Sequence, residues 1–444
     1  MAIHDEPTPS FPLPTREGEG ESDHPPFPRR EGEGGWGRGR GFVLVSALAL
    51  AACGAPDSPR RATPDPAGPS APPRIAGGPA APDANPMAMP APPEPEPAES
   101  VAAVPPEPEA PVLRVELEPD GAFLARPRPA ASPAAYRVWR EKRRIQVGQT
   151  HLGHADLSPD GKLLLVMSGM EATVRIYDTA SGVLVANHQI PGFGQFGRGT
   201  AVFWPQTDRE PAFVFGSEQG IDLRGARDGR VLARLSDAPV WELTWSPDRR
   251  YLVAVQSEIP AQRSTVTFFR VLPDRRLEQL ASASFPHRVD ALSLSDDNRR
   301  MAYLTYPADE LVFHDLAAGE RIWSIPAPQY AAGVDISPDG TLVAAGGAEL
   351  VLVAAADPLR RSYATDFGNN ICQARFSPSG DVVAASSYDG HVRIFPADLS
   401  KPKLKLLKDL RHAGQANVYS VLFLGDGSGL WSSSGDKTLR KFGR

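Results

Sequence analysis

The sequence predicts an all-β fold, a seven-bladed β-propeller of four-stranded antiparallel blades, preceded by a signal peptide and a disordered Pro/Ala-rich linker. Three observations predict it. A motif close to Ser-Pro-Asp-Gly recurs along the C-terminal two thirds of the chain, and short apolar runs flank each copy. The region before the first copy is rich in proline. A recurring motif of this kind indicates one structural unit per copy.

The repeat has seven copies of similar length. Successive turns lie 40 to 49 residues apart, a spacing that fits one blade of four short strands. The turns are centred on Pro159, Pro205, Pro247, Asp296, Pro338, Pro378 and Gly425.

Each copy follows the same physical pattern. An alternating strand runs into the turn, where proline presets the first dihedral angle and glycine takes a positive one. A nearly all-apolar second strand follows, such as LLLVMS from Leu163, as expected for a strand buried on both faces. A third alternating strand and an outer strand complete the unit. The seventh copy reaches Arg444 with its third strand, so residues 143–147 are predicted to supply its fourth and close the ring.

The repeats resemble those of the WD40 family over about residues 142–444. Residues 153–154 are Gly-His where the family has Gly-His, and the pairs at 177–178 and 314–315 stand in for its Trp-Asp. The resemblance implies a propeller that binds other proteins.

The last copy comes nearest to the buried hydrogen-bond set of that family. His412, Ser432 and Asp436 occupy its positions, and Phe442 replaces the tryptophan. The resemblance implies a structural role for these four residues within the blade.

A short apolar run near the N-terminus predicts the location of the protein. Phe42–Ala52 follows two arginines and is too short to span a bilayer as a helix, which is typical of a signal peptide. It ends in Leu-Ala-Ala-Cys, which resembles the lipobox of bacterial lipoproteins. The resemblance implies lipidation of Cys53 and a lipid-anchored protein in the cell envelope, and Gly54 after the cysteine favours the outer membrane, facing the periplasm.

These observations divide the chain into four segments. Residues 1–36 are low-complexity sequence with an internal duplication, which suggests a mis-assigned start; residues 37–53 are the lipoprotein signal peptide and lipobox. Residues 54–135 hold 23 of the 47 prolines and are predicted to be a disordered linker. Residues 136–444 form the propeller. The pattern of residues 113–121 indicates a strand and a turn inside the linker, but it does not predict where they lie relative to the blades.

No pattern indicates an enzyme, a metal site or a cofactor. The pair His151 and His154 has metal-like spacing, but no carboxylate or cysteine cluster completes a site. Cys372 lies in an alternating strand pattern and is interpreted as a small buried residue. The net charge of −6 and the absence of a dominant basic stripe argue against nucleic-acid binding. The densest basic run, residues 137–144, is interpreted as a solvated strand or flank.

Two surfaces are candidates for binding. One propeller face carries arginine pairs in its turns, a possible patch for an anionic partner, although neighbouring aspartates favour ordinary solvated turns: Arg249, Arg250, Arg275, Arg276, Arg299, Arg300, Arg360 and Arg361. The opposite face collects aromatic residues in its loops, which are typical interface anchors: Phe193, Phe196, Trp241, Phe285, Tyr330, Phe367, Tyr388 and Tyr419. About half of the aromatic residues are expected to pack between blades instead.

The sequence therefore predicts a monomeric, membrane-anchored scaffold that binds protein partners in the cell envelope and catalyses no reaction. The alternatives are a propeller enzyme or small-ligand binder that uses the central channel, and an envelope-assembly factor.

Overall fold

The computed structural model describes residues 112–128, 132–147, 152–168, 171–190, 200–205, 209–258, 261–412, 414 and 416–444. The predicted signal peptide and lipobox, with Cys53, lie outside these residues. Among the helices of the described part, none has the length and apolar character needed to cross a membrane.

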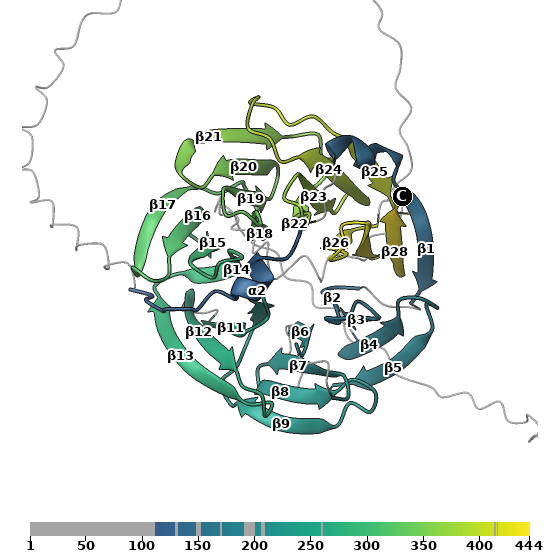
Figure 1. The fold of residues 1–444 in the computed structure, drawn as a ribbon, viewed down its shortest axis with the longest axis vertical. Helices are drawn as coiled ribbons and strands as arrows, with labels where there is room; N and C mark the ends of the chain where they lie inside the picture. Colours follow the sequence, from purple (N-terminus) through teal and green to yellow (C-terminus); the bar gives the residue numbers. More distant parts are fainter. Residues whose placement is uncertain are drawn as a thin grey trace, which may run out of the picture. The chain divides into compact units, whose positions relative to one another are not determined.

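The described strands form seven four-stranded antiparallel sheets around a common centre (Figure 1). Blades 1 to 4 run from inner to outer strand as β2 (Ala155–Leu157), β3 (Leu163–Ser168), β4 (Thr173–Asp178), β5 (Leu184–Gln189); β6 (Thr200–Phe203), β7 (Ala212–Ser217), β8 (Gly220–Gly225), β9 (Val231–Ser236); β10 (Glu242–Trp245), β11 (Tyr251–Glu258), β12 (Arg263–Val271), β13 (Leu277–Phe285); and β14 (Arg288–Leu294), β15 (Arg300–Tyr306), β16 (Glu310–Asp315), β17 (Glu320–Pro326). Blades 5 to 7 are β18 (Gly333–Ile336), β19 (Leu342–Gly346), β20 (Leu350–Ala354), β21 (Asp357–Ala364); β22 (Ile371–Phe376), β23 (Val382–Ser387), β24 (His391–Pro396), β25 (Lys408–Arg411); and β26 (Val418–Phe423), β27 (Gly429–Ser434), β28 (Thr438–Gly443), β1 (Arg140–Gln146).

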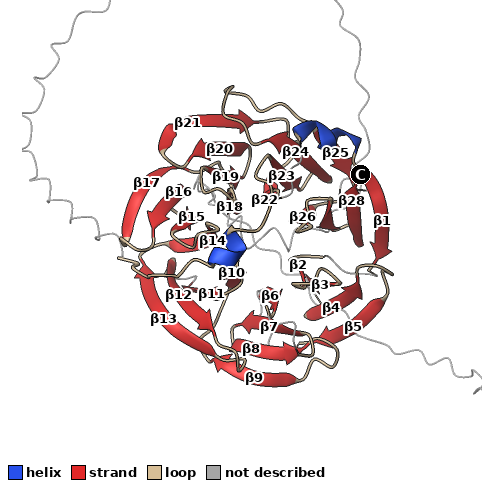
Figure 2. Ribbon diagram, in the orientation of Figure 1, coloured by secondary structure: helices blue, strands red, loops and turns tan. Residues whose placement is uncertain are grey.

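The blades close into a ring, which confirms the predicted seven-bladed propeller. Neighbouring inner strands contact one another in the order β2, β6, β10, β14, β18, β22 and β26, and β26 returns to β2. Two short helices, α2 (Gly121–Leu124) and the 3₁₀ helix η1 (Pro133–Val138), stand out against the strands in Figure 2, and both precede the first blade in sequence.

The repeated turn is held by its own side chains. In blade 5 the Ser337 hydroxyl donates to Asp339 Oδ1 (2.6 Å) and accepts the Leu342 N–H (2.9 Å). Gly340 takes the positive φ of 71°, and in blade 3 Arg249 holds the equivalent position at 57°. The serine and aspartate thus close the first-to-second strand turn before any contact between blades is made.

The second strand of each blade supplies most of the core. Every residue of β23 (VVAASS) is buried, as its nearly all-apolar run predicts, and so is every residue of β7 and β27, although β27 (GLWSSS) also buries three serines. Their side chains fill apolar layers between neighbouring blades; Val382 and Leu430, for example, belong to the layer between blades 6 and 7. Burial of each such side chain stabilises the fold by about 1.5–3 kcal/mol.

The ring is closed by a strand from the N-terminal side of the domain, as predicted. β1 pairs antiparallel with β28 from Arg140 opposite Gly443 to Gln146 opposite Thr438, with a bulge after Glu141. The strand begins at residue 140 rather than 143, so the closing pair is longer than the alternating pattern indicated.

The fold also includes residues 112–128, called here the N-terminal strap, which lie inside the predicted linker. Leu113 and Val115 are buried in the core layer of blades 3 and 4. The Leu113 carbonyl lies 2.9 Å from Nε2 of His314, and the Val115 N–H donates to the carbonyl of Leu316 (2.8 Å). The folded part therefore begins before residue 136, the boundary expected from proline content.

Candidate functional site

The two faces of the ring differ in which turns they carry. The turn face carries the Ser-Pro-Asp-Gly turns and the third-to-fourth strand turns; the loop face carries the connections between blades and the second-to-third strand turns. The strap lies on the turn face, because Arg128 donates to Pro338 O (2.5 Å) in the blade 5 turn and lies 3.4 Å from Asp296 in the blade 4 turn. In Figure 1, α2 of the strap lies over the centre of the ring.

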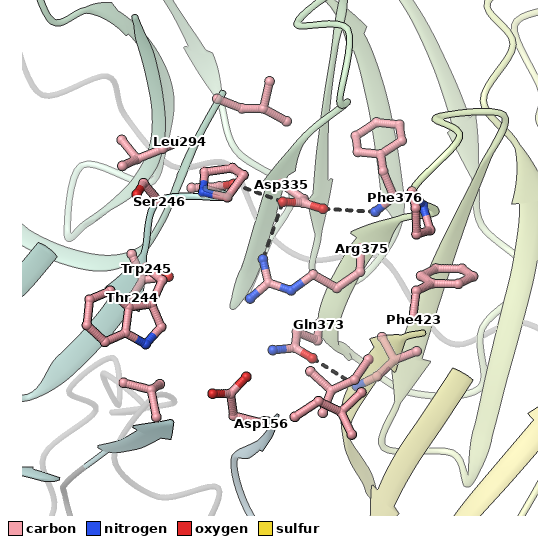
Figure 3. Close-up of a pocket in the computed structure, with 18 of the residues that line it drawn as sticks. Asp156, Thr244, Trp245, Ser246, Leu294, Asp335, Gln373, Arg375, Phe376 and Phe423 are labelled. Carbon is pink, nitrogen blue, oxygen red and sulfur yellow. Dashed lines mark hydrogen bonds and ion pairs between the residues drawn. The ribbon is translucent and has the colours of Figure 1, made fainter. Parts of the chain in front are cut away.

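The inner strands surround a cavity of about 380 Å³, the central channel (Figure 3). Several polar side chains that line it already bond neighbouring blades together. Asp335 accepts the N–H of Phe376 (2.8 Å), and Gln373 accepts the N–H of Val421 (2.9 Å). Asp156 makes the equivalent bond from blade 1 to blade 2. These three side chains therefore hydrogen-bond the inner strands of neighbouring blades to one another.

The cations of the channel are paired with its carboxylates. Arg375 Nη1 lies 3.4 Å from Asp335 Oδ1, and Ser293 also donates to that oxygen (2.8 Å). Arg249, one of the predicted turn-face arginines, pairs inside the channel with Asp156 (3.0 Å). Because each charge has a partner, the channel has little free charge to attract a charged substrate.

Glu242 and His154 are the exceptions among the titratable groups near the channel. Neither side chain makes a hydrogen bond or ion pair with another described residue. Burial raises the pKa of Glu242 to about 8, and the nearby charge of Arg375 only partly opposes it. Burial lowers the pKa of His154. Both groups are therefore neutral near pH 7.

No metal site is present within the described residues, where no group of three potential ligands comes together. His151, the predicted partner of His154, lies outside them. Burial raises the pKa of the Cys372 thiol, which stays protonated and is not an activated nucleophile.

The last blade brings its four predicted residues together. His412 Nε2 lies 2.7 Å from the Ser432 hydroxyl, its Nδ1 lies 3.4 Å from Asp436, and its ring meets Phe442 edge-on with centroids 6.1 Å apart. Burial lowers the pKa of His412. Arg440 adds an ion pair to Asp436 (2.7 Å) that the repeat pattern did not indicate.

Asp436 is the charged centre of this set. Burial alone would raise its pKa, but hydrogen bonds from His412 and Thr438 and the charge of Arg440 hold the pKa well below its usual range. The set lies within one blade, so its role is to hold β27 and β28 to the loop before β26.

The remaining turn-face arginines mostly have partners. Arg250 lies 3.5 Å from Glu118 of the strap, and Arg275 donates to the Glu210 carbonyl (2.6 Å). Arg276 and Arg300 form ion pairs with the aspartates beside them, Asp274 and Asp315. Arg275 therefore has a backbone partner but no ion pair, and for Arg299 the described residues show no side-chain partner of either kind.

Arg360 and Arg361 do not lie in a turn. Both are part of β21, the outer strand of blade 5. The third-to-fourth strand turn of this blade is shorter than expected, because β21 starts at Asp357, directly after the turn that follows β20. The pair is therefore on the circumference of the ring rather than on the turn face.

The predicted aromatic residues divide between the core and the loop face. Phe285 is buried in the core layer of blades 3 and 4, and Phe193 and Phe196 lie outside the described residues. Trp241 precedes β10 and is half-buried. Tyr330 lies in the loop between blades 4 and 5 and is 45 % exposed.

Four of them are grouped here by their place toward the loop face and called the aromatic patch: Tyr330, Phe367, Tyr388 and Tyr419. Of these, Phe367 also packs against the core of blades 5 and 6, with its ring 5.9 Å from that of buried Phe395. Tyr388 and Tyr419 meet edge to face with ring centroids 5.9 Å apart, and the Arg393 guanidinium lies 5.0 Å from the centre of the Phe367 ring. Tyr330, Phe367 and Tyr388 lie in connections of blades 4 to 6, and Tyr419 is the second residue of β26 in blade 7.

Comparison with known proteins agrees with the repeat and the fold. Residues 361–395 match the WD40 family, described as WD domain, G-beta repeat. A chain of the "Crystal Structure of Mitotic Checkpoint Complex" is similar in fold with a TM-score of 0.54 and 16 % identity, over 72 % of this chain and 97 % of that chain. No curated protein matches the sequence. The resemblance to WD40 repeats is thus confirmed at blades 5 and 6, within a seven-bladed propeller.

Proposed function

We propose that the chain is a membrane-tethered propeller lipoprotein that acts as a non-catalytic protein-interaction scaffold in the bacterial cell envelope. The fold supports the scaffold role, because a propeller with a WD40 repeat is typical of proteins that bind other proteins. The similar chain in the solved structure also belongs to a protein complex. At this level of identity the likeness concerns the fold, so the binding role needs its own support from the surface.

The aromatic patch on the loop face is the observation that carries this proposal. Tyrosine and phenylalanine bury much area at low entropic cost and are enriched among residues that dominate binding energy. The strap occupies the centre of the turn face, where Arg128 binds two turns, so the loop face is the end of the channel that the strap leaves uncovered. A protein partner would dock there against Tyr330 and its neighbours.

The absence of catalysis is part of the proposal, and the channel chemistry supports it. Asp156, Asp335 and Gln373 are used to hold blades together, and Arg249 and Arg375 are paired with two of them. General acid–base or nucleophilic catalysis requires a group aimed at substrate and a partner that activates it. The described residues offer no such pair in the channel.

The tether rests on the sequence around Cys53. A lipid on that cysteine would anchor the chain, and two or three acyl chains are needed for stable attachment. Replacement of Cys53 by Ser should move the full chain from the membrane fraction to the soluble fraction of its native cells. Wild-type chain found in the soluble fraction would refute the tether and leave the scaffold role standing.

The scaffold role is tested by crosslinking in intact cells, followed by mass spectrometry of the proteins captured with the chain. We expect Tyr330→Ala with Tyr388→Ala to lose the captured partners, because both substitutions remove aromatic area from the patch. The matched control is Val183→Ala with Val231→Ala, two exposed positions at or beside outer strands. Partners retained by the tyrosine variant, with its melting temperature unchanged, would overturn the assignment of the patch.

A small-ligand binder is the second candidate, and one observation favours it. The channel offers about 380 Å³ and is lined by Leu243 and Thr244 of β10. The carboxyl of Glu242, the first residue of that strand, is neutral near pH 7 and has no described partner. A neutral, hydrogen-bonding ligand would suit this volume better than an ion. Thermal stabilisation of the chain by a member of a metabolite library, lost in Glu242→Ala, would favour this role.

A further inference from the structure

The circumference of blades 5, 6 and 7 carries exposed cations from three separate stretches of sequence. We define the basic band as six of them: Arg140, Lys142, Arg360, Lys401, Lys405 and Arg411. All six are exposed, and none forms an ion pair with another described residue. This contrasts with the turn-face arginines, most of which have carboxylate partners.

The fold makes the band continuous between blades 5 and 6. The connection from β24 to β25 folds back along β21, because the Ser362 hydroxyl donates to the Lys401 carbonyl (2.5 Å) and the Tyr363 N–H donates to the Pro402 carbonyl (2.9 Å). Lys401 and Lys405 are therefore brought to the strand that carries Arg360. In Figure 1 this connection arches along β21 toward η1.

A second set of contacts joins blade 6 to blade 7. Lys408 of β25 donates to the carbonyl of Arg137 in η1 (3.2 Å), and η1 leads directly into β1 with Arg140 and Lys142. Figure 1 shows η1 beside β25 and β1 following it around the rim. The basic run 137–144 thus becomes one end of a longer surface.

Most carboxylates near the band are bonded to groups outside it. The exposed carboxylate of Asp398 lies within electrostatic range of Lys401 and Arg360, and its oxygens accept the N–H and the hydroxyl of Ser400. Glu141 of β1 pairs with Arg144 (2.9 Å) and with buried Arg440 (3.0 Å), and Asp409 of β25 lies 2.7 Å from His391. The six cations of the band therefore have no carboxylate ion-pair partner among the described residues, although the net charge of the whole chain is −6. An uneven distribution of this kind directs anionic surfaces to one side of a protein.

Exposed apolar side chains lie among these cations. Leu359 is 81 % exposed on β21, Val138 is 66 % exposed in η1, and Leu406 is 37 % exposed between Lys405 and β25. Cations interspersed with exposed aliphatic groups match the interface of a bilayer, where the charges meet phosphates and the apolar groups reach the acyl boundary. A nucleic-acid backbone would use the cations alone.

We propose that the basic band binds the surface of a membrane that contains anionic lipids. The circumference of blades 5 to 7 then contacts the bilayer, and neither the turn face nor the loop face is turned toward the membrane. This contact uses residues outside the aromatic patch and requires no lipid on Cys53, so it stands or falls independently of the proposed function.

The test uses the full chain with Cys53→Ser, so that no acyl chain contributes, and vesicles of phosphatidylcholine alone or in equal parts with phosphatidylglycerol. We expect binding to the anionic vesicles only, weakening as salt is raised, because salt screens exposed charges. Lys142→Gln, Lys401→Gln and Lys405→Gln together should lower the partition coefficient about tenfold or more. The matched control replaces three exposed cations of blades 1 to 3: Lys162→Gln, Arg230→Gln and Arg263→Gln.

The Leu359→Ser variant distinguishes binding to a membrane from binding to a nucleic acid. It should weaken binding to anionic vesicles and leave binding to duplex DNA unchanged, since the leucine contributes only where an acyl layer is present. The proposal is overturned by equal binding to both kinds of vesicle, or by an equal loss of binding in the control variant. Duplex DNA bound more tightly than anionic vesicles, with Leu359→Ser without effect on either, would assign the band to nucleic acid instead.

Discussion

Arg249 in the turn of blade 3 forms an ion pair with Asp156 of blade 1, at 3.0 Å, and so spans blade 2. The same guanidinium donates to the carbonyl of Leu157 (3.0 Å) in blade 1 and that of Phe203 (3.3 Å) in blade 2. Three blades are therefore joined by one side chain at the turn-face end of the channel. Asp156 in turn accepts the Phe203 N–H (2.8 Å), so the contact is a network rather than a single pair.

Removal of this guanidinium should weaken the ring. Arg249→Ala leaves Asp156 largely buried without its cation, and we expect a loss of about 2 kcal/mol in the free energy of unfolding. For a domain of this size that corresponds to a fall of about 4 °C in Tm. Thermal unfolding followed by circular dichroism measures it. Arg276→Ala, which breaks an exposed pair, is the control and should leave Tm close to that of the wild type.

The strap offers a second test, because its apolar residues should matter only if they are packed. Leu113 is 1 % exposed, so Leu113→Ala should cost about 2–4 kcal/mol in unfolding free energy. Val112 is 74 % exposed, and Val112→Ala should cost little. Equal, negligible effects of the two substitutions on Tm would mean that residues 112–128 belong to the linker after all.

Acidification should destabilise the propeller through His412. Burial lowers its pKa in the folded state, so below the unfolded pKa of about 6.5 unfolding takes up a proton and stability falls as the pH is lowered. Burial lowers the pKa of His154, His287 and His314 in the same direction. We expect Tm to fall steadily below about pH 6.5. His412→Gln should make this dependence shallower; an identical slope would show that His412 does not contribute.

Glu242 has the opposite dependence. Its folded pKa of about 8 lies above the ordinary value of 4.5 for a glutamate, so its neutral form is favoured in the fold and stability is lost as the pH rises between these values. Glu242→Gln removes the ionisation and keeps the size. The Tm of this variant relative to wild type should increase with pH across that window. A difference in Tm that is constant with pH would contradict the raised pKa.

The regular part of the fold could be predicted from sequence because its causes are local. The turn of blade 5, for example, is specified by Ser337, Asp339 and Gly340, which lie within four residues and bond to one another. Closure by β1 was predictable as well, because the last copy lacks a fourth strand and an alternating stretch precedes the first. The start of that strand was missed by three residues, since Arg140 and Lys142 carry no apolar signal.

The strap could not be placed from sequence. Its apolar alternation is short and lies among prolines, and its partners His314 and Leu316 are about 200 residues away. The pairing of Arg249 with Asp156 was missed for a similar reason: it depends on the distance across a closed ring, which no local pattern encodes. Arg360 was assigned to a turn, whereas it lies in β21, which starts at Asp357.

The pairing of β1 with β28 also fixes the order of events during synthesis. β1 leaves the ribosome about 300 residues before β28, the strand that Arg140 to Gln146 must meet. Until Thr438 to Gly443 has been made, blade 7 cannot form and both ends of the arc expose apolar side chains, among them Ile145 and Trp431. The ring is therefore completed only after translation of the whole domain, and a product truncated before β28 retains an open seam that chaperones and proteases can recognise.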